Sequence, residues 1–167
     1  DAYTCSLEET ILTEITANAL DSGATRISFQ PNASDATLTV IDNGRGMARR
    51  DLARYHNVAA SSKARGEGIG FAGVGIKLGL LVADEVVTET RRGATHVATT
   101  WRLATRYRAP WKWIPPPGLI TERGTAVRLK LSNPLSPLLD TGYLEEAVRT
   151  HFAALLADPA AGWVDAA

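Results

Sequence analysis

A run of twelve residues, GIGFAGVGIKLG at positions 68–79, holds five glycines and strongly limits how this chain can fold. The segment that follows, residues 76–86, has the pattern of a helix. Backbone N–H groups that are free of side chains and lead into a helix N-terminus favour an anion. The run therefore predicts a phosphate-binding loop.

Two common phosphate loops do not fit this run. Gly68, Gly70 and Gly73 satisfy the pattern G-x-G-x-x-G, but the dinucleotide-binding loop needs a buried strand before it, and the preceding residues are SSKARGE. A P-loop needs Gly-Lys-Ser/Thr, whereas Lys77 follows Ile76 and precedes Leu78. Neither a Rossmann domain nor a P-loop domain is expected.

Composition excludes several other classes. The length of 167 residues predicts one domain with a sizeable core. Eighteen basic and eighteen acidic residues cancel, so no overall charge draws the chain to nucleic acid or to an anionic membrane. Cys5 is the single cysteine and cannot form an internal disulfide. With no long apolar run, the chain is expected to have no membrane partner and to be cytoplasmic.

The order of apolar patterns predicts the fold class. Leu7, Ile11, Ile15 and Ala19 recur at helical spacing before Gly23, and residues 25–42 read as a hairpin. Further segments are expected as a short helix at 48–55, a helix over 76–86 that passes into a strand, strands at 95–104, 111–114 and 124–131, and a last helix capped by Asp140 or Thr141. This order predicts an α/β sandwich in which helices cover one face of a mixed sheet.

The first predicted helix carries a polar stripe. Glu14, Asn18 and Asp21 lie at i, i+4 and i+7, beside the apolar arc of that helix. A carboxylate can accept a proton from water, and an amide oxygen can ligate a hard cation such as Mg²⁺. The stripe could orient water against a metal-bound phosphate; a solvated polar face is the other interpretation.

A third candidate, VIDNGRGM at residues 40–47, closes the hairpin. Asp42, at the end of an apolar strand, could accept a hydrogen bond from an exocyclic amine while the glycines after it let the backbone pass close to a flat ring. Adenine carries such an amine. An Asn-Gly turn with Asp42 as a turn former is the alternative.

Together these stretches resemble the GHKL, or Bergerat-fold, ATPases, a family that includes HtpG-type chaperones, MutL-type and MORC proteins, gyrases and histidine kinases. Residues 14–25 (EITANALDSGAT) look like the family's N-box, and residues 40–47 look like its adenine box. Residues 68–79 resemble its glycine-rich lid, and residues 124–131 (GTAVRLKL) are similar to its closing strand. The sequences of these motifs most resemble those of the HtpG, MORC and MutL branches. The resemblance implies a two-layer α/β sandwich with a mostly antiparallel sheet.

The resemblance also implies roles for single residues. Glu14 would be the general base that activates water, Asn18 would hold Mg²⁺, and Asp42 would bind the adenine amino group. The remaining implied ligand-binding residues are Asp21 near the base, Gly44, Gly46 and Met47 beside the ring, Thr125 through a water, and Lys63, Gly70, Gly73, Val74, Gly75 and Lys77 around the phosphates.

For the chain as a whole, the resemblance implies Mg²⁺-dependent binding and hydrolysis of ATP. These would drive a conformational switch that promotes homodimerisation in a longer chaperone-like or DNA-processing protein. The alternative is a nucleotide-responsive binding module with little hydrolysis. Residues 1–140 would be the ATP-binding domain, and residues 141–167 a helix and tail that connect to a further domain.

One motif has no role in that family. RYRAPWKWIPPP, residues 106–117, interleaves basic and aromatic side chains: Arg106, Tyr107, Arg108, Trp111, Lys112 and Trp113. This is the composition of a stacking surface for single-stranded nucleic acid. The alternative is a strand that buries both tryptophans on one face.

Overall fold

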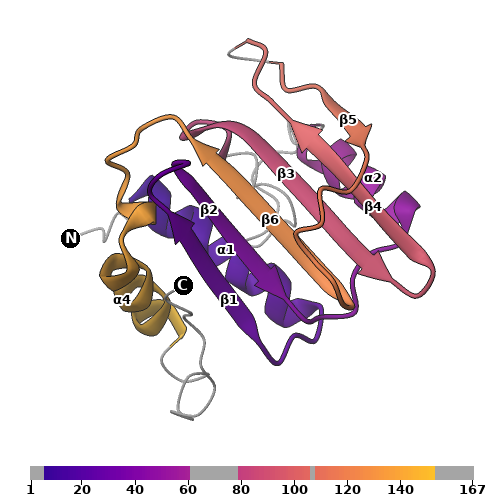
Figure 1. Cartoon of the computed structure of the whole chain (residues 1–167), viewed down its shortest axis with the longest axis horizontal. Helices are drawn as coiled ribbons and strands as arrows, with labels where there is room; N and C mark the ends of the chain where they lie inside the picture. Colours follow the sequence, from indigo (N-terminus) through magenta and orange to yellow (C-terminus); the bar gives the residue numbers. More distant parts are fainter. Residues whose placement is uncertain (1–5, 61–78, 106–107, 153–167) are drawn as a thin grey trace.

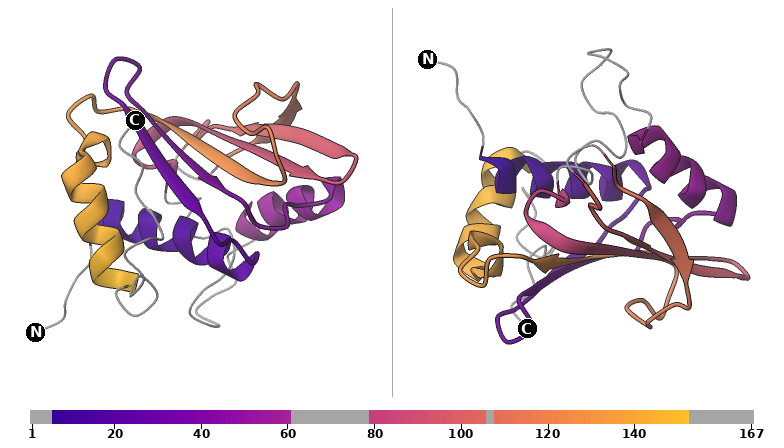
Figure 2. Two further views of the ribbon diagram at one scale, coloured as in Figure 1. Left: turned by 60° about the horizontal axis from the view of Figure 1, so that its bottom comes forward. Right: turned by 90° about the horizontal axis from the view of Figure 1, so that it is seen from above.

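The computed structural model describes residues 6–60, 79–105 and 108–152, which form a layer of sheet and a layer of helices (Figures 1 and 2). In order, the elements are α1 (Leu7–Asp21), β1 (Ile27–Asn32), β2 (Thr37–Asp42), α2 (Arg49–Ala60), β3 (Ala83–Arg92), β4 (Thr95–Trp101), β5 (Trp111–Ile114), β6 (Gly124–Leu131), the 3₁₀ turn η1 (Pro137–Leu139) and α4 (Thr141–Phe152). The predicted α/β sandwich is confirmed.

The six strands lie in the order β1-β2-β6-β3-β4-β5. Every pair among these described strands is antiparallel, so the mostly antiparallel sheet implied by the family resemblance is confirmed and the described strands include no parallel pair. The last strand in sequence, β6, lies between β2 and β3 in the middle of the sheet. It thereby joins the N-terminal hairpin to the β3–β4–β5 meander.

Helix α1 covers the β1–β2 half of the sheet (Figure 2). Ser6 caps its N-terminus, since the Ser6 hydroxyl accepts a hydrogen bond from the backbone N–H of Glu9 at 3.2 Å. Its apolar residues, including Ile11 and Ile15, are buried in the core. The helix ends before Gly23, which adopts a φ of +77° as the sequence predicts for a helix stop.

Helix α2 covers the other half of the same face, over β3, β4 and β5 (Figures 1 and 2). His56 is fully buried there, and its Nε2 lies 2.7 Å from the Thr99 hydroxyl. Its ring stacks on Trp111 with centroids 5.0 Å apart and meets Trp101 edge-on at 4.9 Å. Burial lowers the pKa of His56 to about 4, so the ring is neutral near pH 7.

Helix α4 packs beside α1 at one end of the sandwich, where Leu144 and Val148 are buried. The Asp140 carboxylate accepts a hydrogen bond from the backbone N–H of Gly142 at 2.8 Å, which confirms the predicted cap. None of the helices in the described ranges is both long and apolar enough to cross a membrane.

The helix expected over residues 76–86 is wrong for its second half, because β3 already begins at Ala83. The register pairs Ala83 with Leu131 and Glu85 with Lys130 of β6, with a bulge between Ala83 and Glu85. Burial of Ala83 and Val86 against β6 overrides a pattern that reads as helical in isolation. Periodicity cannot separate a short buried strand from a helix segment.

The opposite face of the sheet is held by a buried carboxylate, Glu89 of β3. One of its oxygens accepts hydrogen bonds from the backbone N–H groups of Gly118 (2.9 Å) and Leu119 (3.0 Å). The other accepts from the N–H of Ile120 (3.1 Å) and from His96 Nε2 (3.0 Å). Burial alone raises the pKa of Glu89, but these donors outweigh it and hold the pKa below its ordinary value. Glu89 thus anchors the β5–β6 connection.

Replacement of this anchor, Glu89→Gln, is expected to lower the free energy of unfolding at pH 7 by about 1–3 kcal/mol, because an amide NH₂ faces N–H donors that it cannot accept from. The folded-state pKa is depressed, so the contribution of Glu89 is complete above the ordinary pKa of 4.5 and is lost as the pH falls below it. Urea unfolding of wild type and variant between pH 7 and pH 3 measures both effects. Glu122→Gln, at an exposed position, is the matched control. An equal loss of stability in both variants would contradict the anchoring role of Glu89.

Candidate functional site

Three polar side chains lie in a row across the middle of the sheet. The register places Thr125 of β6 opposite both Asp42 of β2 and Thr90 of β3. Directly opposed residues on antiparallel strands project from the same face of the sheet. Asp42 and Thr125 both line the cavity described below, on the side that the helices cover.

Asp42 is held by the loop that follows it. Its carboxylate accepts a hydrogen bond from the backbone N–H of Gly44 at 2.8 Å, so it is a turn former as well as part of the row. The Asn43 side chain ties the loop to the connection between α1 and β1, because its oxygen accepts from the N–H groups of Thr25 (2.8 Å) and Arg26 (2.9 Å). Burial raises the pKa of Asp42 to about 6 although the backbone N–H of Gly44 works against the shift. The carboxylate is poorly solvated and has acceptor capacity left.

Two glycines of this loop are required by close packing. A Cβ on Gly44 would clash with the Ser22 side chain, and one on Gly46 would clash with the backbone carbonyl of Arg91. Gly46 also has a φ of +69°, which favours glycine. The close approach at Gly44 and Gly46 is therefore to protein atoms, and the predicted contact of these glycines with a bound ring stays a prediction.

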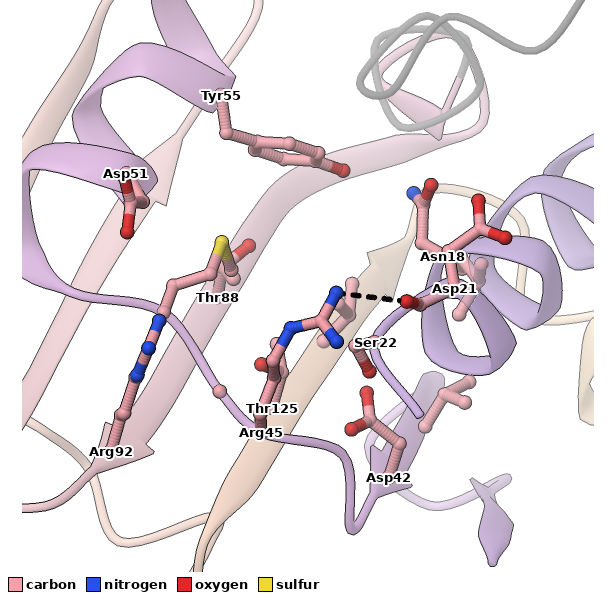
Figure 3. A pocket seen from close by; sticks show the side chains of 15 residues that line it. Asn18, Asp21, Ser22, Asp42, Arg45, Asp51, Tyr55, Thr88, Arg92 and Thr125 are labelled. Atoms are coloured by element: carbon pink, nitrogen blue, oxygen red, sulfur yellow. Dashed lines mark hydrogen bonds between the residues drawn. The ribbon is translucent and has the colours of Figure 1, made fainter. Parts of the chain in front are cut away.

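The polar stripe of α1 reaches the same region. Asn18 and Asp21 line the cavity, and Figure 3 shows their side chains across from Asp42 and Tyr55. Glu14 is half-buried one turn before Asn18 and is not part of the lining. Burial, and secondarily the charge of Asp21, raise the pKa of Glu14. Glu14 lies near the cavity rather than in its wall.

The cavity between the helices and the sheet has a volume of about 320 Å³. This is within the range of small-molecule sites. Its apolar wall combines helix and sheet residues: Ile15, Val40, Met47 and Val127. Its polar wall holds Asn18, Asp21, Ser22, Asp42, Arg45, Asp51, Tyr55, Thr88, Arg92 and Thr125. Of the predicted site residues in the described ranges, all line this cavity except Glu14 and Gly44. Glu14 lies one turn of α1 before Asn18, and Gly44 donates its backbone N–H to the Asp42 carboxylate.

Several residues in or beside the cavity wall were not predicted from the sequence: Arg45, Tyr55 and Thr88 line it, and Thr90 bonds to residues that do. Thr90 connects the parts of the site, since its hydroxyl lies 3.1 Å from the Thr125 hydroxyl, donates to the Gly124 carbonyl at 3.1 Å and accepts from the Met47 N–H at 2.8 Å. Arg45 crosses to α1 and donates to the Asp21 carbonyl at 3.0 Å (dashed in Figure 3). Tyr55 comes from α2. The alternation of Thr88 and Thr90 in a strand is a signal that could have revealed two of them.

The predicted phosphate-binding residues lie outside the described ranges. These are Lys63, Gly70, Gly73, Val74, Gly75 and Lys77. Within the described ranges, no cluster of three or more His, Cys, Asp or Glu side chains could hold a metal by itself. A site with one protein amide oxygen, Asn18, suits Mg²⁺ that is bound mainly by phosphates and water.

The motif at 106–117 is described from Arg108 onward, and its two tryptophans are half-buried. Trp111 stacks on His56, and the Arg49 guanidinium lies 3.9 Å from the centre of the Trp113 ring. The two indoles meet edge-on with centroids 5.4 Å apart. These contacts support the interpretation of a strand whose tryptophans pack under α2, and contacts with nucleic acid remain a prediction.

Chaperone proteins HtpG from several bacteria are similar to this chain. A chaperone protein HtpG of Rhodospirillum rubrum is 32% identical over 145 residues, which cover 77% of this chain and 22% of the relative. The HtpG of Methylorubrum populi is 30% identical over 151 residues, 80% of this chain and 23% of the relative. The HtpG of Rhodopseudomonas palustris BisB5 is 36% identical over 91 residues, 47% of this chain and 14% of the relative. The chain thus spans less than a quarter of the length of these relatives.

A family model described as histidine kinase-, DNA gyrase B- and HSP90-like ATPase matches residues 5–117. The match contains α1, the hairpin with Asp42, and the strand that carries Thr88 and Thr90. It therefore includes most of the wall of the cavity. Together with the antiparallel sheet and the row of Asp42, Thr125 and Thr90, this match shows that the chain belongs to the histidine kinase-, DNA gyrase B- and HSP90-like ATPase family.

Proposed function

We propose that the cavity binds ATP, with the adenine at Asp42. The observation that carries this proposal is a half-buried carboxylate with unused acceptor capacity beside an apolar wall. The exocyclic amine of adenine donates to Asp42, and the flat ring lies against Val40, Val127 and Met47. Membership of the family supports the same assignment. The phosphates in this proposal are bound by Lys63, Gly70, Gly73, Val74, Gly75 and Lys77.

Hydrolysis is assigned to α1. Glu14 takes the proton of the attacking water, and burial suits it to that role because it raises the proton affinity of the carboxylate. Asn18 holds Mg²⁺, which when bound neutralises charge on the phosphates. Asp21 is a polar neighbour whose charge further raises the pKa of Glu14. Catalysis of this kind rests on positioning and electrostatics, without a covalent intermediate.

The function of the longer protein is proposed from its relatives, which are chaperone proteins. Nucleotide binding closes the segment around 59–75 and promotes association of two copies, so that ATP acts as a conformational switch. Residues 141–167 connect the 1–140 domain to the next one. A cytoplasmic location remains a prediction. The second candidate is a nucleotide-responsive module with little hydrolysis. It is favoured by the position of Glu14, which is near the cavity but is not one of its lining residues.

Adenine recognition is tested by Asp42→Asn, which is expected to abolish binding of ADP because the added NH₂ opposes the amine of the base. The raised pKa of Asp42 means that the folded chain binds more protons than the unfolded chain between the ordinary pKa of 3.8 and about 6. Ionised Asp42 therefore costs stability at pH 7, and the variant without nucleotide is expected to melt at the same temperature or higher. Calorimetric titration and thermal melts measure the two effects.

The control for this test is Asp35→Asn in the exposed β1–β2 turn, which is expected to keep wild-type affinity for ADP. In the wild type, affinity for ADP is expected to weaken as the pH falls through about 6, since a neutral carboxyl is the weaker acceptor. Undiminished ADP binding by Asp42→Asn would overturn the adenine assignment.

Replacement of Glu14 by alanine separates hydrolysis from binding. We expect ATP turnover to fall by a factor of about 10²–10⁴, the usual contribution of a general base, with affinity for ADP unchanged. Steady-state phosphate release and calorimetry provide the measurements, and Glu8→Ala in the first turn of the same helix is the matched control. Equal turnover in wild type and Glu14→Ala would leave the binding module as the better description.

The dimer switch is tested by sedimentation of the longer protein. A monomer is expected without nucleotide, and a dimer with a non-hydrolysable ATP analogue, because closure over the nucleotide creates the contact between copies. Asp42→Asn serves as the control that cannot bind the analogue and stays monomeric. Identical sedimentation of the wild type with and without the analogue would refute the switch.

A further inference from the structure

Thr88 of β3 is a cavity residue to which neither the sequence nor the family assigns a role. Its side chain is 1% exposed and lies in the cavity wall on the helix-covered face (Figure 3). The register places it opposite Val127 of β6 on one side and Thr99 of β4 on the other. Thr88 therefore belongs to the row next to that of Asp42, deeper under α2.

The neighbouring threonine hydroxyls on the sheet are already engaged. The Thr99 hydroxyl is paired with His56, and the Thr90 hydroxyl with Gly124 and Met47. Val127 offers only carbon atoms. Within the described part of the chain, the Thr88 hydroxyl has no hydrogen-bond partner.

A buried hydroxyl without a partner is unfavourable, and buried polar groups in folded proteins nearly always have one. Valine has almost the same shape and would fill this position without that cost. Thr88 lines the cavity although its hydroxyl oxygen is itself buried, and rotation about χ1 moves that hydroxyl to another staggered position. The missing partner is therefore best supplied from the cavity.

We propose that the Thr88 hydroxyl donates a hydrogen bond to a ring nitrogen of the bound purine, directly or through one water molecule. This inference rests on the proposed ATP site. Asp42 and Thr88 lie two strands and two residues apart, which puts their Cα atoms about 12 Å apart. A purine fits between two side chains at that separation. With its exocyclic amine at Asp42, the polar atoms left on an adenine are ring nitrogens, which accept hydrogen bonds.

The test is Thr88→Val, compared with wild type in calorimetric titration with ADP. We expect the affinity to fall about 3- to 10-fold, the usual range for one neutral hydrogen bond. The melting temperature without nucleotide is expected to stay the same or to rise, because the variant removes an unpaired buried hydroxyl. A purely structural role for Thr88 would instead lower the melting temperature and leave the affinity unchanged, which would overturn the inference.

Thr16→Val is the matched control. Thr16 of α1 also has a buried hydroxyl without a partner in the described ranges, but it does not line the cavity. Its replacement is expected to leave ADP affinity unchanged. A loss of affinity equal to that of Thr88→Val would mean that any such replacement disturbs the site, and the inference would fail.

Deaza analogues of ADP, each with one ring nitrogen replaced by C–H, identify the contact. Wild type is expected to bind one of them more weakly than ADP, and Thr88→Val is expected to lose that discrimination. If Thr88→Val weakens ADP and all analogues equally, the hydroxyl does not contact a ring nitrogen and the inference is wrong. If wild type binds ADP and Thr88→Val binds it equally well, only this inference fails; if wild type binds no ADP, the proposed ATP site fails with it.

Discussion

The insertion of β6 between β2 and β3 is the constraint on which the rest of the structure depends. Antiparallel pairing on both sides of β6 fixes one register, and that register puts Asp42, Thr125 and Thr90 in line although they are far apart in sequence. A slip by one residue would turn the side chains of a strand to the opposite face. Thr90 reinforces the register by bonding to Gly124, Thr125 and Met47, so the loop after Asp42 is attached to β3 as well as to α1.

Two carboxylates on this sheet, Glu89 and Asp42, differ in how their surroundings shift the pKa. Glu89 is buried on the open face, but four donors satisfy it and its pKa falls. Asp42 is half-buried on the helix-covered face, has fewer donors, and burial raises its pKa. A carboxylate that folding leaves short of donors can gain one from a ligand. The number of hydrogen-bond donors therefore distinguishes Glu89 from Asp42, the carboxylate that we propose binds adenine.

Sequence reasoning located the parts of the site that lie within single elements. Helix α1 with Asn18 and Asp21, the hairpin with Asp42, and strand β6 follow from local periodicity and turn chemistry, whereas Thr125 was singled out only by the family resemblance. The alternation of Thr88 and Thr90 marks one face of a strand, but their position near Asp42 depends on which strand pairs with β6, and local sequence does not determine that pairing. The start of β3 at Ala83 also depends on pairing with β6. The local sequence is compatible with a helix or a strand, and burial of Ala83 and Val86 against β6 favours the strand. Glu14 is not among the residues that line the cavity, and this depends on the orientation of α1 about its axis on the sheet.

The basic and aromatic segment before β6 illustrates how packing changes the interpretation of a composition. Its residues match those of a stacking surface, but a stacking surface needs ring faces that are open to bases. Trp111 uses a face to stack on the neutral ring of His56, and Trp113 uses one to hold Arg49. Because His56 and Arg49 both belong to α2, the tryptophans attach that helix to the edge of the sheet. Helix α2 also carries Tyr55 and Asp51, so this aromatic packing positions one wall of the cavity.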